Sequence, residues 1–380
     1  MTSDLRRSVE VDFLRGVVLI VIAVDHISGS ALAKFMLHNY AYCDAAEVFV
    51  FLGGYASAAA YTAIATNRGA GAAIARFIQR SGEIYRAYLV TAALMLGCGA
   101  LMTLFHLRTP MLELTEWPLF ARQPLEMAGD IAIFRHQPYL AAVLPMYALF
   151  ALGASALVPC ARCSPRVTLF GSLAIWLLAP LFGEVLPSEN ASGWGFNPFA
   201  WQLMFVLGML VRLHPAPAAL YGSRTGVWLT RISVGVALSF AVSKLMLQTQ
   251  PMPGVMKQHL APLRIVSFAA IAWPVAVMVH RGWLRNVANR ARSIVNVGQQ
   301  GMACFVVGSV ASLVIDTAMR NAGPYRAPFV AGLVGDALAV VTVMTTAWVV
   351  RRRKQRITVR RRNEGAELQP RRRQQTADAA

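Results

Sequence analysis

The stretch VDFLRGVVLIVIAVDHISG, residues 11–29, is apolar enough to enter a lipid bilayer, yet four of its side chains are ionisable. These are Asp12, Arg15, Asp25 and His26. Each such group costs roughly 2.5 to 3.5 kcal/mol at the centre of a bilayer on insertion scales. A membrane helix that contains all four therefore needs a protein partner or a water-lined space for them. The stretch indicates a membrane protein with a polar interior.

The composition of the whole chain supports this class. Of the 380 residues, 56% are hydrophobic and 14% are charged, whereas about a quarter of the residues of a soluble domain are charged. A membrane-spanning helix needs about 20 apolar residues. We count ten such runs, at about 12–33, 45–64, 87–106, 138–158, 167–186, 199–212, 227–247, 263–280, 294–316 and 328–350. Because the runs are continuous rather than alternating, we expect an all-α polytopic bundle of about ten spans.

The distribution of Lys and Arg predicts the orientation of these spans. Loops on the side of the N-terminus are rich in arginine, whereas the segment 187–198 on the other side contains no Lys or Arg. Basic loops stay in the cytoplasm. An even number of spans then places both termini on the cytoplasmic side.

A change of composition near Val350 divides the chain. Residues 351–380 contain eleven basic and three acidic residues and no aromatic residue. A surface that stacks on nucleic-acid bases would need aromatic side chains, so we expect no nucleic-acid partner. We expect residues 1–350 to form one membrane domain. Residues 351–380 are predicted to be a basic, disordered cytoplasmic tail that contacts anionic membrane lipid.

Two further segments contain residues that are typical of functional sites. Cys160 and Cys163 form a CxxC motif, but no second pair and no histidines follow at ligand spacing. We therefore predict no metal site. The segment 107–137 contains prolines and charges of both signs. It is predicted to be a folded periplasmic loop with a short helix, which can act as a lid.

The spacing of Arg15 and His26 points to a shared function. Eleven steps of about 100° make three turns plus about 20°, so both side chains project from one helix face, about 16 Å apart along the axis. Asp25 lies about 100° away and is not expected to touch His26 directly. Arg15 alone is also consistent with an anchor that reaches the interface. Two polar groups on one face, with Asp25 beside them, favour a functional interpretation.

Three blocks of sequence resemble a known family. They are VDFLRG and VDHISG around Arg15 and His26, DAAEVFVFLGGYASAAAY at 44–61 and GWGFNPFAWQLMFVLGM at 193–209. Through them the chain resembles the acyltransferase family 3 of membrane enzymes, and more closely its OpgC branch. The resemblance implies an enzyme of the bacterial inner membrane that transfers an acyl group, succinyl in OpgC proteins, to hydroxyls of an osmoregulated periplasmic glucan. Succinyl-CoA would be a co-substrate, with no tightly bound cofactor.

This reaction suits the first helix. We expect Arg15 to bind the phosphates of coenzyme A while the pantetheine arm reaches His26. His26 is expected to be the general base that takes the proton of the sugar hydroxyl; an acyl-histidine intermediate is the alternative. Asp25 can orient a neighbour or the acceptor hydroxyl. Arg80 and Arg86, in the next predicted cytoplasmic loop, either add phosphate contacts or anchor the topology.

Five more residues are candidates near the periplasmic face. Asp44 and Glu47 begin the second span, where a carboxylate can bind sugar hydroxyls or orient the imidazole; a helix N-terminus also favours acids for structural reasons alone. At the start of the sixth span, Trp201 can stack on a sugar ring while Asn197 and Gln202 bind its hydroxyls. Aromatic residues at that depth are also common membrane anchors.

The sequence leaves open which cation would bind a charged acyl group, and whether the protein is an enzyme or a transporter. A succinyl group needs a cation near its free carboxylate, and the candidates are Lys244, Lys257, Arg264 and Arg326. A transporter or flippase of a lipid-linked sugar would also contain buried ionisable groups. Transfer of label from succinyl-CoA to glucan would separate an enzyme from a transporter.

Overall fold

Seven helices are long and apolar enough to cross a membrane. The computed structural model describes residues 8–107, 109–189, 193–247, 254–321 and 328–377. The seven are α2 (Ala45–Arg68), α3 (Ala70–Leu104), α7 (Val143–Cys163), α12 (Arg224–Val242), α14 (Pro262–His280), α17 (Gly301–Asn321) and α18 (Pro328–Ala377). The structure is 84% helical, and the described residues contain no strand. The prediction of an all-α polytopic bundle is confirmed.

Three of the ten predicted runs correspond to shorter helices. These are α1 (Val9–Asp25), α8 (Pro165–Leu177) and α10 (Pro198–Leu213). Helix α1 ends at Asp25 instead of continuing to residue 33 as predicted. Its end is explained by the polar contacts of the chain after it, since Ser28 and the turn that follows are hydrogen-bonded to buried carboxylates. The number of spans that cross the bilayer stays a prediction.

Short helices connect the long ones. They are η1 (Leu32–Phe35), η2 (Leu37–Asn39), α4 (Met111–Leu114), α5 (Trp117–Phe120), α6 (Pro124–Ala132), η3 (Tyr139–Ala141), α9 (Ala179–Glu184), α11 (Ala218–Gly222), η4 (Ser243–Leu247), α13 (Gly254–Gln258), α15 (Trp283–Arg290) and α16 (Arg292–Gln299). Helices α4, α5 and α6 all lie in the segment 107–137. The predicted folded loop is therefore present, and it contains three short helices where one was expected.

Helix α3 differs most from its predicted span. It begins at Ala70, whereas the apolar run begins near residue 87. Arg80 and Arg86 therefore lie on this helix and not in a loop, which corrects the prediction. Residues 70–86 are rich in Ala and Arg, which favour helix. Glu83 also bridges Arg76 and Arg80 along the helix surface, at 3.1 Å from each.

Glycines allow two pairs of helices to pack backbone against backbone. A Cβ atom on Gly54 of α2 would lie 1.9 Å from the carbonyl oxygen of Phe205 on α10, and one on Gly208 would lie 2.0 Å from that of Phe51. A Cβ atom on Gly16 would lie 2.0 Å from the carbonyl oxygen of Ile294. No other residue fits at such distances. These contacts fix α2 on α10 and α1 on α16, so Gly16, Gly54 and Gly208 serve helix packing.

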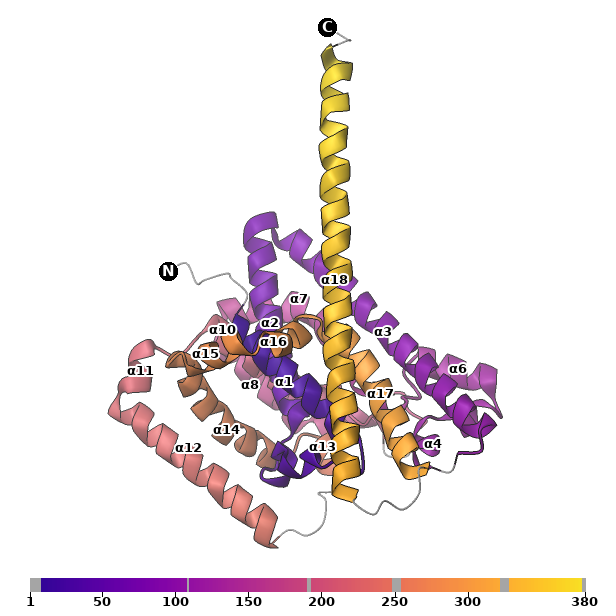
Figure 1. Cartoon of the computed structure of the whole chain (residues 1–380). Helices are drawn as coiled ribbons and strands as arrows, with labels where there is room; N and C mark the ends of the chain where they lie inside the picture. The colour runs from indigo at the N-terminus through magenta and orange to yellow at the C-terminus, as the bar shows by residue number, and fades with distance from the viewer. Residues whose placement is uncertain (1–7, 108, 190–192, 248–253, 322–327, 378–380) are drawn as a thin grey trace.

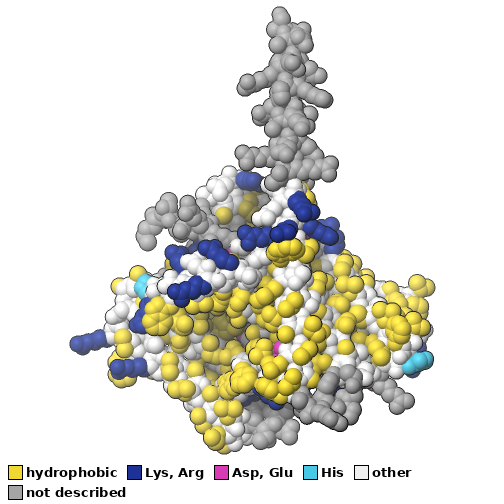
Figure 2. All heavy atoms as spheres, viewed as in Figure 1, with side chains coloured by type: hydrophobic (Ala, Val, Ile, Leu, Met, Phe, Trp, Pro, Cys, Tyr) yellow, Lys and Arg dark blue, Asp and Glu magenta, His cyan; other side chains and the backbone are white. Residues whose placement is uncertain are grey.

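Helix α18 continues well beyond the predicted end of the membrane domain. It runs without a break from Pro328 to Ala377 and extends away from the bundle (Figure 1). The sequence predicted disorder from residue 351, whereas the structure has helix there. A span that is already helical supplies the costly first turn, so arginine-rich residues that favour helix extend it. Figure 2 shows Lys and Arg side chains gathered where α18 leaves the bundle, beside a broad hydrophobic face.

Candidate functional site

His26 is the first residue beyond α1, and its ring orientation is fixed by the helix. Its Nδ1 atom lies 2.6 Å from the carbonyl oxygen of Ile22, one turn back. A carbonyl oxygen only accepts hydrogen bonds, so Nδ1 must carry the proton and donate it. The neutral imidazole then has its lone pair on Nε2. This is the tautomer that a general base requires.

A cavity of about 140 Å³ lies against this imidazole. Its lining residues come from the end of α1 and from α3, α4, η3 and α17: Asp25, His26, Ser28, Met95, Met111, Leu114, Tyr139, Leu140 and Leu313. A water molecule occupies roughly 30 Å³ in the liquid, so the cavity has room for a short acyl group. Met111 and Leu114 of α4 belong to the segment 107–137, so this segment forms part of the cavity wall. A role of the segment as a lid stays a prediction.

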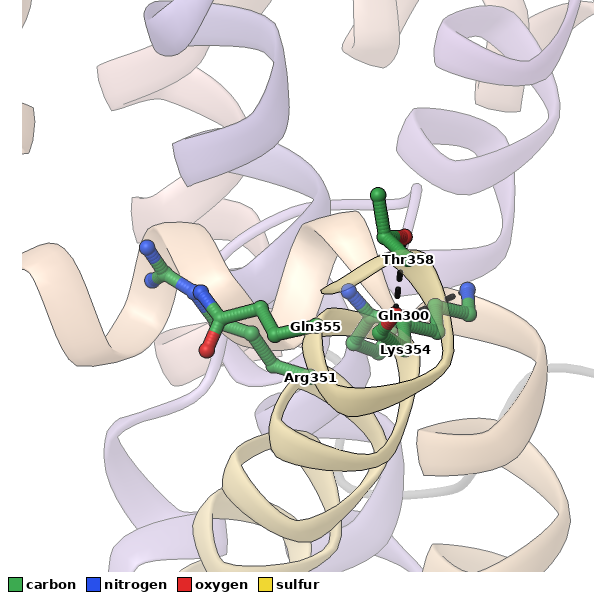
Figure 3. Close-up of a pocket in the computed structure, with 5 residues that line it drawn as sticks. All are labelled: Gln300, Arg351, Lys354, Gln355 and Thr358. Atoms are coloured by element: carbon green, nitrogen blue, oxygen red, sulfur yellow. Dashed lines mark hydrogen bonds between the residues drawn. The ribbon is translucent and has the colours of Figure 1, made fainter. Parts of the chain in front are cut away.

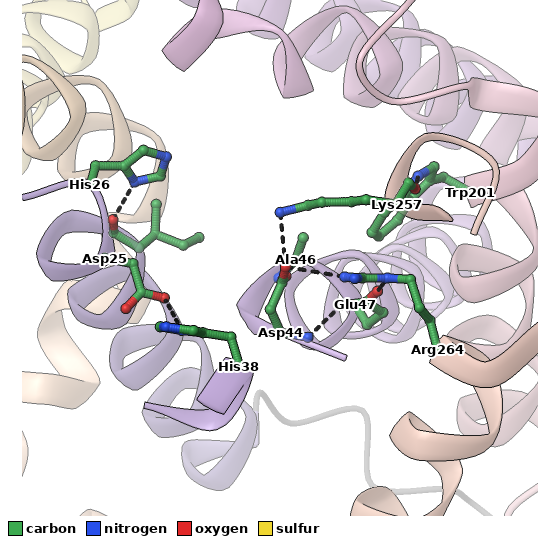
Figure 4. A network of polar contacts seen from close by, with 10 residues as sticks. Asp25, His26, His38, Asp44, Ala46, Glu47, Trp201, Lys257 and Arg264 are labelled. Carbon is green, nitrogen blue, oxygen red and sulfur yellow. Dashed lines mark hydrogen bonds and ion pairs between the residues drawn. The ribbon is translucent and has the colours of Figure 1, made fainter. Parts of the chain in front are cut away.

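Asp25 lies next to His26 but points elsewhere. Its Oδ2 atom is 3.4 Å from Nδ1 of His38, and Figure 4 shows its carboxylate turned toward His38 and away from the imidazole of His26. This agrees with the 100° offset expected from the sequence. Its other oxygen, Oδ1, is buried and has no hydrogen-bond partner among the described residues. Asp25 is also one of the residues that line the cavity.

A buried network of four charges lies at the start of α2. Glu47 is fully buried, accepts a 2.5 Å hydrogen bond from Nε of Arg264, and also accepts one from the backbone N–H of Asp44. Asp44 accepts from Nη2 of Arg264 at 3.1 Å and from Nζ of Lys257 at 2.8 Å. Asp44 is at the same time the N-cap of α2, through a hydrogen bond from Ala46. The network therefore joins α2, α13 and α14.

The two members of this network outside the spans are strongly held in their charged forms. Burial alone would raise the pKa of the Asp44 carboxyl, but the charges of Lys257 and Arg264 hold that pKa well below its usual range. Burial also opposes the charge of Lys257, yet the Asp44 carboxylate raises its pKa above the ordinary value. Both groups stay charged across the physiological range of pH.

Lys257 also approaches the imidazole. Figure 4 shows its side chain extending from α13 toward His26, and its ammonium interacts electrostatically with that ring. About 39% of the lysine side chain is exposed, in contrast to 7% for Arg264. A cation beside a base makes that base weaker. The ion pair with Asp44 holds Lys257 in this position, and its exposed part can meet a second anion.

Arg15 faces the inside of the bundle and not lipid. Its Nη2 atom is 3.9 Å from the position that a Cβ atom on Gly301 of α17 would take. Its charge also acts on the hydroxyl of Tyr147, a buried residue of α7. Arg15 and His26 therefore both lie on the inner side of α1. The cavity at His26 lies at the C-terminal end of α1, and Arg15 is not among its lining residues. A path from Arg15 to that cavity is therefore a prediction.

The structure gives Arg80 and Arg86 local partners. Arg80 pairs with Glu83, and Arg86 donates to the carbonyl oxygen of Gly82 on its own helix. Both contacts lie on the surface of α3, and Arg86 is exposed. A contact of either residue with a donor phosphate stays a prediction.

The residues at the start of α10 have structural partners. Asn197 is buried, donates to the carbonyl oxygen of Ala179 at 2.7 Å, and caps α10 by accepting from the N–H of Phe199. Trp201 is fully buried, and its indole N–H donates to the carbonyl oxygen of Lys257 at 3.0 Å. A buried indole cannot stack on a sugar, so this expectation is corrected. Trp201 instead fixes the backbone that places Lys257.

Gln202 joins two helices. Its Nε2 atom donates to the carbonyl oxygen of Ser172 on α8 at 2.8 Å, and its Oε1 atom accepts from the hydroxyl of Ser172 at 2.7 Å. The amide that was predicted to bind a sugar hydroxyl is thus used between α10 and α8. Together with Asn197 and Trp201, it stabilises the wall of the site.

Two carboxylates that the sequence did not single out position the chain after His26. Asp316 of α17 accepts a hydrogen bond from the N–H of Ser28 at 2.8 Å. Asp336 of α18, which is 1% exposed, accepts from the N–H groups of Ala31 and Leu32 at 3.0 and 2.8 Å. Each aspartate interrupts an apolar run, and that is the one sequence signal that could have identified them.

Comparison with known proteins gives one result. A family model described as OpgC protein matches residues 7–355 of the chain. No curated protein and no solved structure matches.

Proposed function

The chain belongs to the OpgC protein family, and from this membership we propose that it is a membrane acyltransferase. The proposed reaction transfers an acyl group, succinyl in the first instance, from acyl-CoA to a hydroxyl of a periplasmic glucan. The proposed location is the bacterial inner membrane with both termini in the cytoplasm. The gathering of Lys and Arg side chains where α18 leaves the bundle supports this orientation.

The observation on which the proposal depends is the state of His26. Its Nδ1–H group is held by Ile22, and the ring adjoins a cavity large enough for a short acyl group. In the proposed step, Nε2 takes the proton of the sugar hydroxyl while the hydroxyl oxygen forms a bond to the thioester carbonyl carbon. The carbon–sulfur bond then breaks, and the leaving thiolate takes the proton from the imidazolium. Ester and free thiol are the products.

Asp25 is proposed to orient the acceptor. Asp25 lines the same cavity as the imidazole, and its buried Oδ1 atom has no partner among the described residues. A carboxylate oxygen accepts hydrogen bonds from sugar hydroxyls. Such a bond would hold the acceptor while its reacting hydroxyl faces Nε2 of His26.

Lys257 is proposed to bind the free carboxylate of the acyl group. It extends toward His26, more than a third of its side chain is exposed, and Asp44 holds it in its charged form. A charge-assisted contact of this kind would favour succinyl over an uncharged acyl group of the same length. Among the four cations considered from the sequence, Arg264 is held inside the network and Arg326 lies outside the described residues.

The test is transfer of label by purified full-length protein. Succinyl-CoA labelled in the acyl group is incubated with periplasmic glucan, and the glucan is analysed by mass spectrometry. We expect the mass increment of succinylation with the native protein, and a loss of about a hundredfold or more in rate with His26→Ala. His280→Ala is the matched control, because His280 stacks on Tyr221 away from the site.

Transport is the competing function. A flippase or transporter would move a glucan or lipid-linked sugar across the bilayer without changing its mass. Movement of unmodified sugar into proteoliposomes, without succinylation under any donor condition, would reject the acyltransferase. Near-normal turnover of His26→Ala would reject His26 as the base.

A further inference from the structure

A second cavity lies at the junction of α16, α17 and α18. Its volume is about 510 Å³. It is lined by Gln300 and by four residues of α18, namely Arg351, Lys354, Gln355 and Thr358 (Figure 3). The spacing of these four residues, three, four and seven apart, puts them on one face of α18. We call this cavity, with its five lining residues, the basic groove.

The groove is formed by residues of one charge sign. Arg351 and Lys354 are its charged residues, and the two glutamines add neutral hydrogen-bonding groups. Lys354 donates to Oε1 of Gln300 at 2.7 Å, which fixes the lysine across the groove. Guanidinium, ammonium and amide N–H groups together are the donors that bind phosphate. Arg80, by contrast, is already paired with Glu83.

The groove is connected to Arg15 through the chain segment 299–301. Gln300, which lines the groove, precedes Gly301, and Nη2 of Arg15 is 3.9 Å from the position of a Cβ atom on Gly301. Gln299, on the other side, donates to Oδ2 of Asp12 on α1 at 3.2 Å. Three consecutive residues, 299–301, therefore connect the polar groups of α1 to the groove. An anion held in the groove would be within a short reach of the Arg15 guanidinium.

We propose that the basic groove binds the phosphate-bearing end of the acyl thioester donor. Arg351, Lys354 and Gln300 contact the phosphates. Arg15 adds a phosphate contact at the point where the arm begins its path toward His26, about 16 Å further along α1. This inference rests on the proposed function, and it assigns the donor site to α16 and α18 in place of Arg80 and Arg86. The headgroup phosphate of an anionic lipid has the same chemistry as the donor phosphates. The experiment below distinguishes these two ligands.

The experiment measures binding to full-length protein in nanodiscs of zwitterionic lipid. The probes are coenzyme A, adenosine 3′,5′-bisphosphate and, as a ligand without phosphate, pantetheine. The variant is the double substitution Arg351→Gln with Lys354→Gln. The matched control is Arg353→Gln, which removes the same kind of charge from the opposite face of α18. The thermal midpoint of each variant reports whether it is folded.

We expect the native protein and the Arg353→Gln control to bind coenzyme A and the bisphosphate alike, and more weakly at high salt. The double variant should bind both about tenfold or more weakly, while its weak binding of pantetheine is unchanged. In transfer assays, the KM for the donor should rise by a similar factor at unchanged kcat. Unaltered affinity for coenzyme A in the folded double variant would overturn the proposal.

Three further outcomes distinguish a lipid phosphate from a donor phosphate, and the donor site from the proposed reaction. If the double variant loses only its preference for nanodiscs that contain anionic lipid, the groove is a lipid site and the donor assignment is wrong. If coenzyme A binds in the groove but no acyl group is ever transferred, the groove assignment holds and the proposed acyltransferase fails. If the double variant forms succinylated glucan with an unaltered KM for the donor, the acyltransferase proposal is supported and the groove assignment is rejected.

Discussion

Arg264 donates from Nε to the carboxylate of Glu47 at 2.5 Å, and both side chains are buried. The pair joins α14 to α2, two helices that are far apart in the sequence. Since Asp44 also binds Arg264 and Lys257, the pair stabilises the side of the site from which Lys257 reaches toward His26. Four predictions follow from this arrangement and from the first helix.

Replacing Glu47 by Ala should destabilise the protein by about 3 kcal/mol or more, because it leaves the buried Arg264 guanidinium with an incomplete set of partners. The measurement is the thermal midpoint in detergent micelles. The matched control is Glu83→Ala, which breaks the surface pairs with Arg76 and Arg80 and should cost at most about 1 kcal/mol. Equal effects of the two substitutions would contradict the importance given to the buried pair.

Arg15→Ala should raise the KM for acyl-CoA with a smaller effect on kcat, because the proposed contact is made to the donor phosphates. Arg15→Lys should restore binding only in part, since an ammonium lacks the two-pronged geometry of a guanidinium. Initial rates at varied donor concentration measure both. A fall in kcat alone, with unchanged KM, would place Arg15 in the chemical step instead.

Lys257→Gln should change which donor is preferred. With succinyl-CoA, kcat/KM should fall about tenfold or more, as expected for the loss of a charge-assisted contact. With butyryl-CoA, which has the same chain length and no carboxylate, it should be nearly unchanged. An equal loss with both donors would indicate that Lys257 stabilises the oxyanion of the intermediate and would reject its proposed contact with the acyl carboxylate.

The pH dependence of turnover should report on His26 and not on the Asp44–Lys257 pair. The pKa of Asp44 is lowered, so its ion pair is lost only as pH falls through that low value. The pKa of Lys257 is raised, so its charge is lost only as pH rises through that high value. Both charges of the pair therefore stay unchanged between about pH 5 and 9, the interval that contains the ordinary pKa of an imidazole. Within this interval, kcat/KM should rise with pH as His26 loses its proton.

Removal of the Lys257 charge tests whether His26 is the titrating group. In Lys257→Gln the acid limb of the profile with butyryl-CoA should move to higher pH, because a nearby positive charge disfavours the imidazolium. The Arg353→Gln substitution, at the surface of α18, serves as the control and should leave the limb in place. A limb that does not move would mean that the titrating group is not His26.

The sequence by itself determined the class of the protein and the face of its first helix. Continuous apolar runs required helices because lipid provides no hydrogen-bond partner for the backbone. The fixed 100° per residue of an α-helix placed Arg15 and His26 on one side and Asp25 on another. Local geometry is sufficient for each of these conclusions.

Only the tertiary structure decided which polar groups meet. Asn197, Trp201 and Gln202 were expected to face a sugar, but the fold surrounds them with backbone carbonyl groups and with Ser172, which take their hydrogen bonds. Lys257 and Arg264 were two of four unranked cations until the fold brought both to Asp44. A buried polar group takes whichever partner the packing of distant helices brings within about 3 Å, and residue spacing along one helix contains no information about those distant partners.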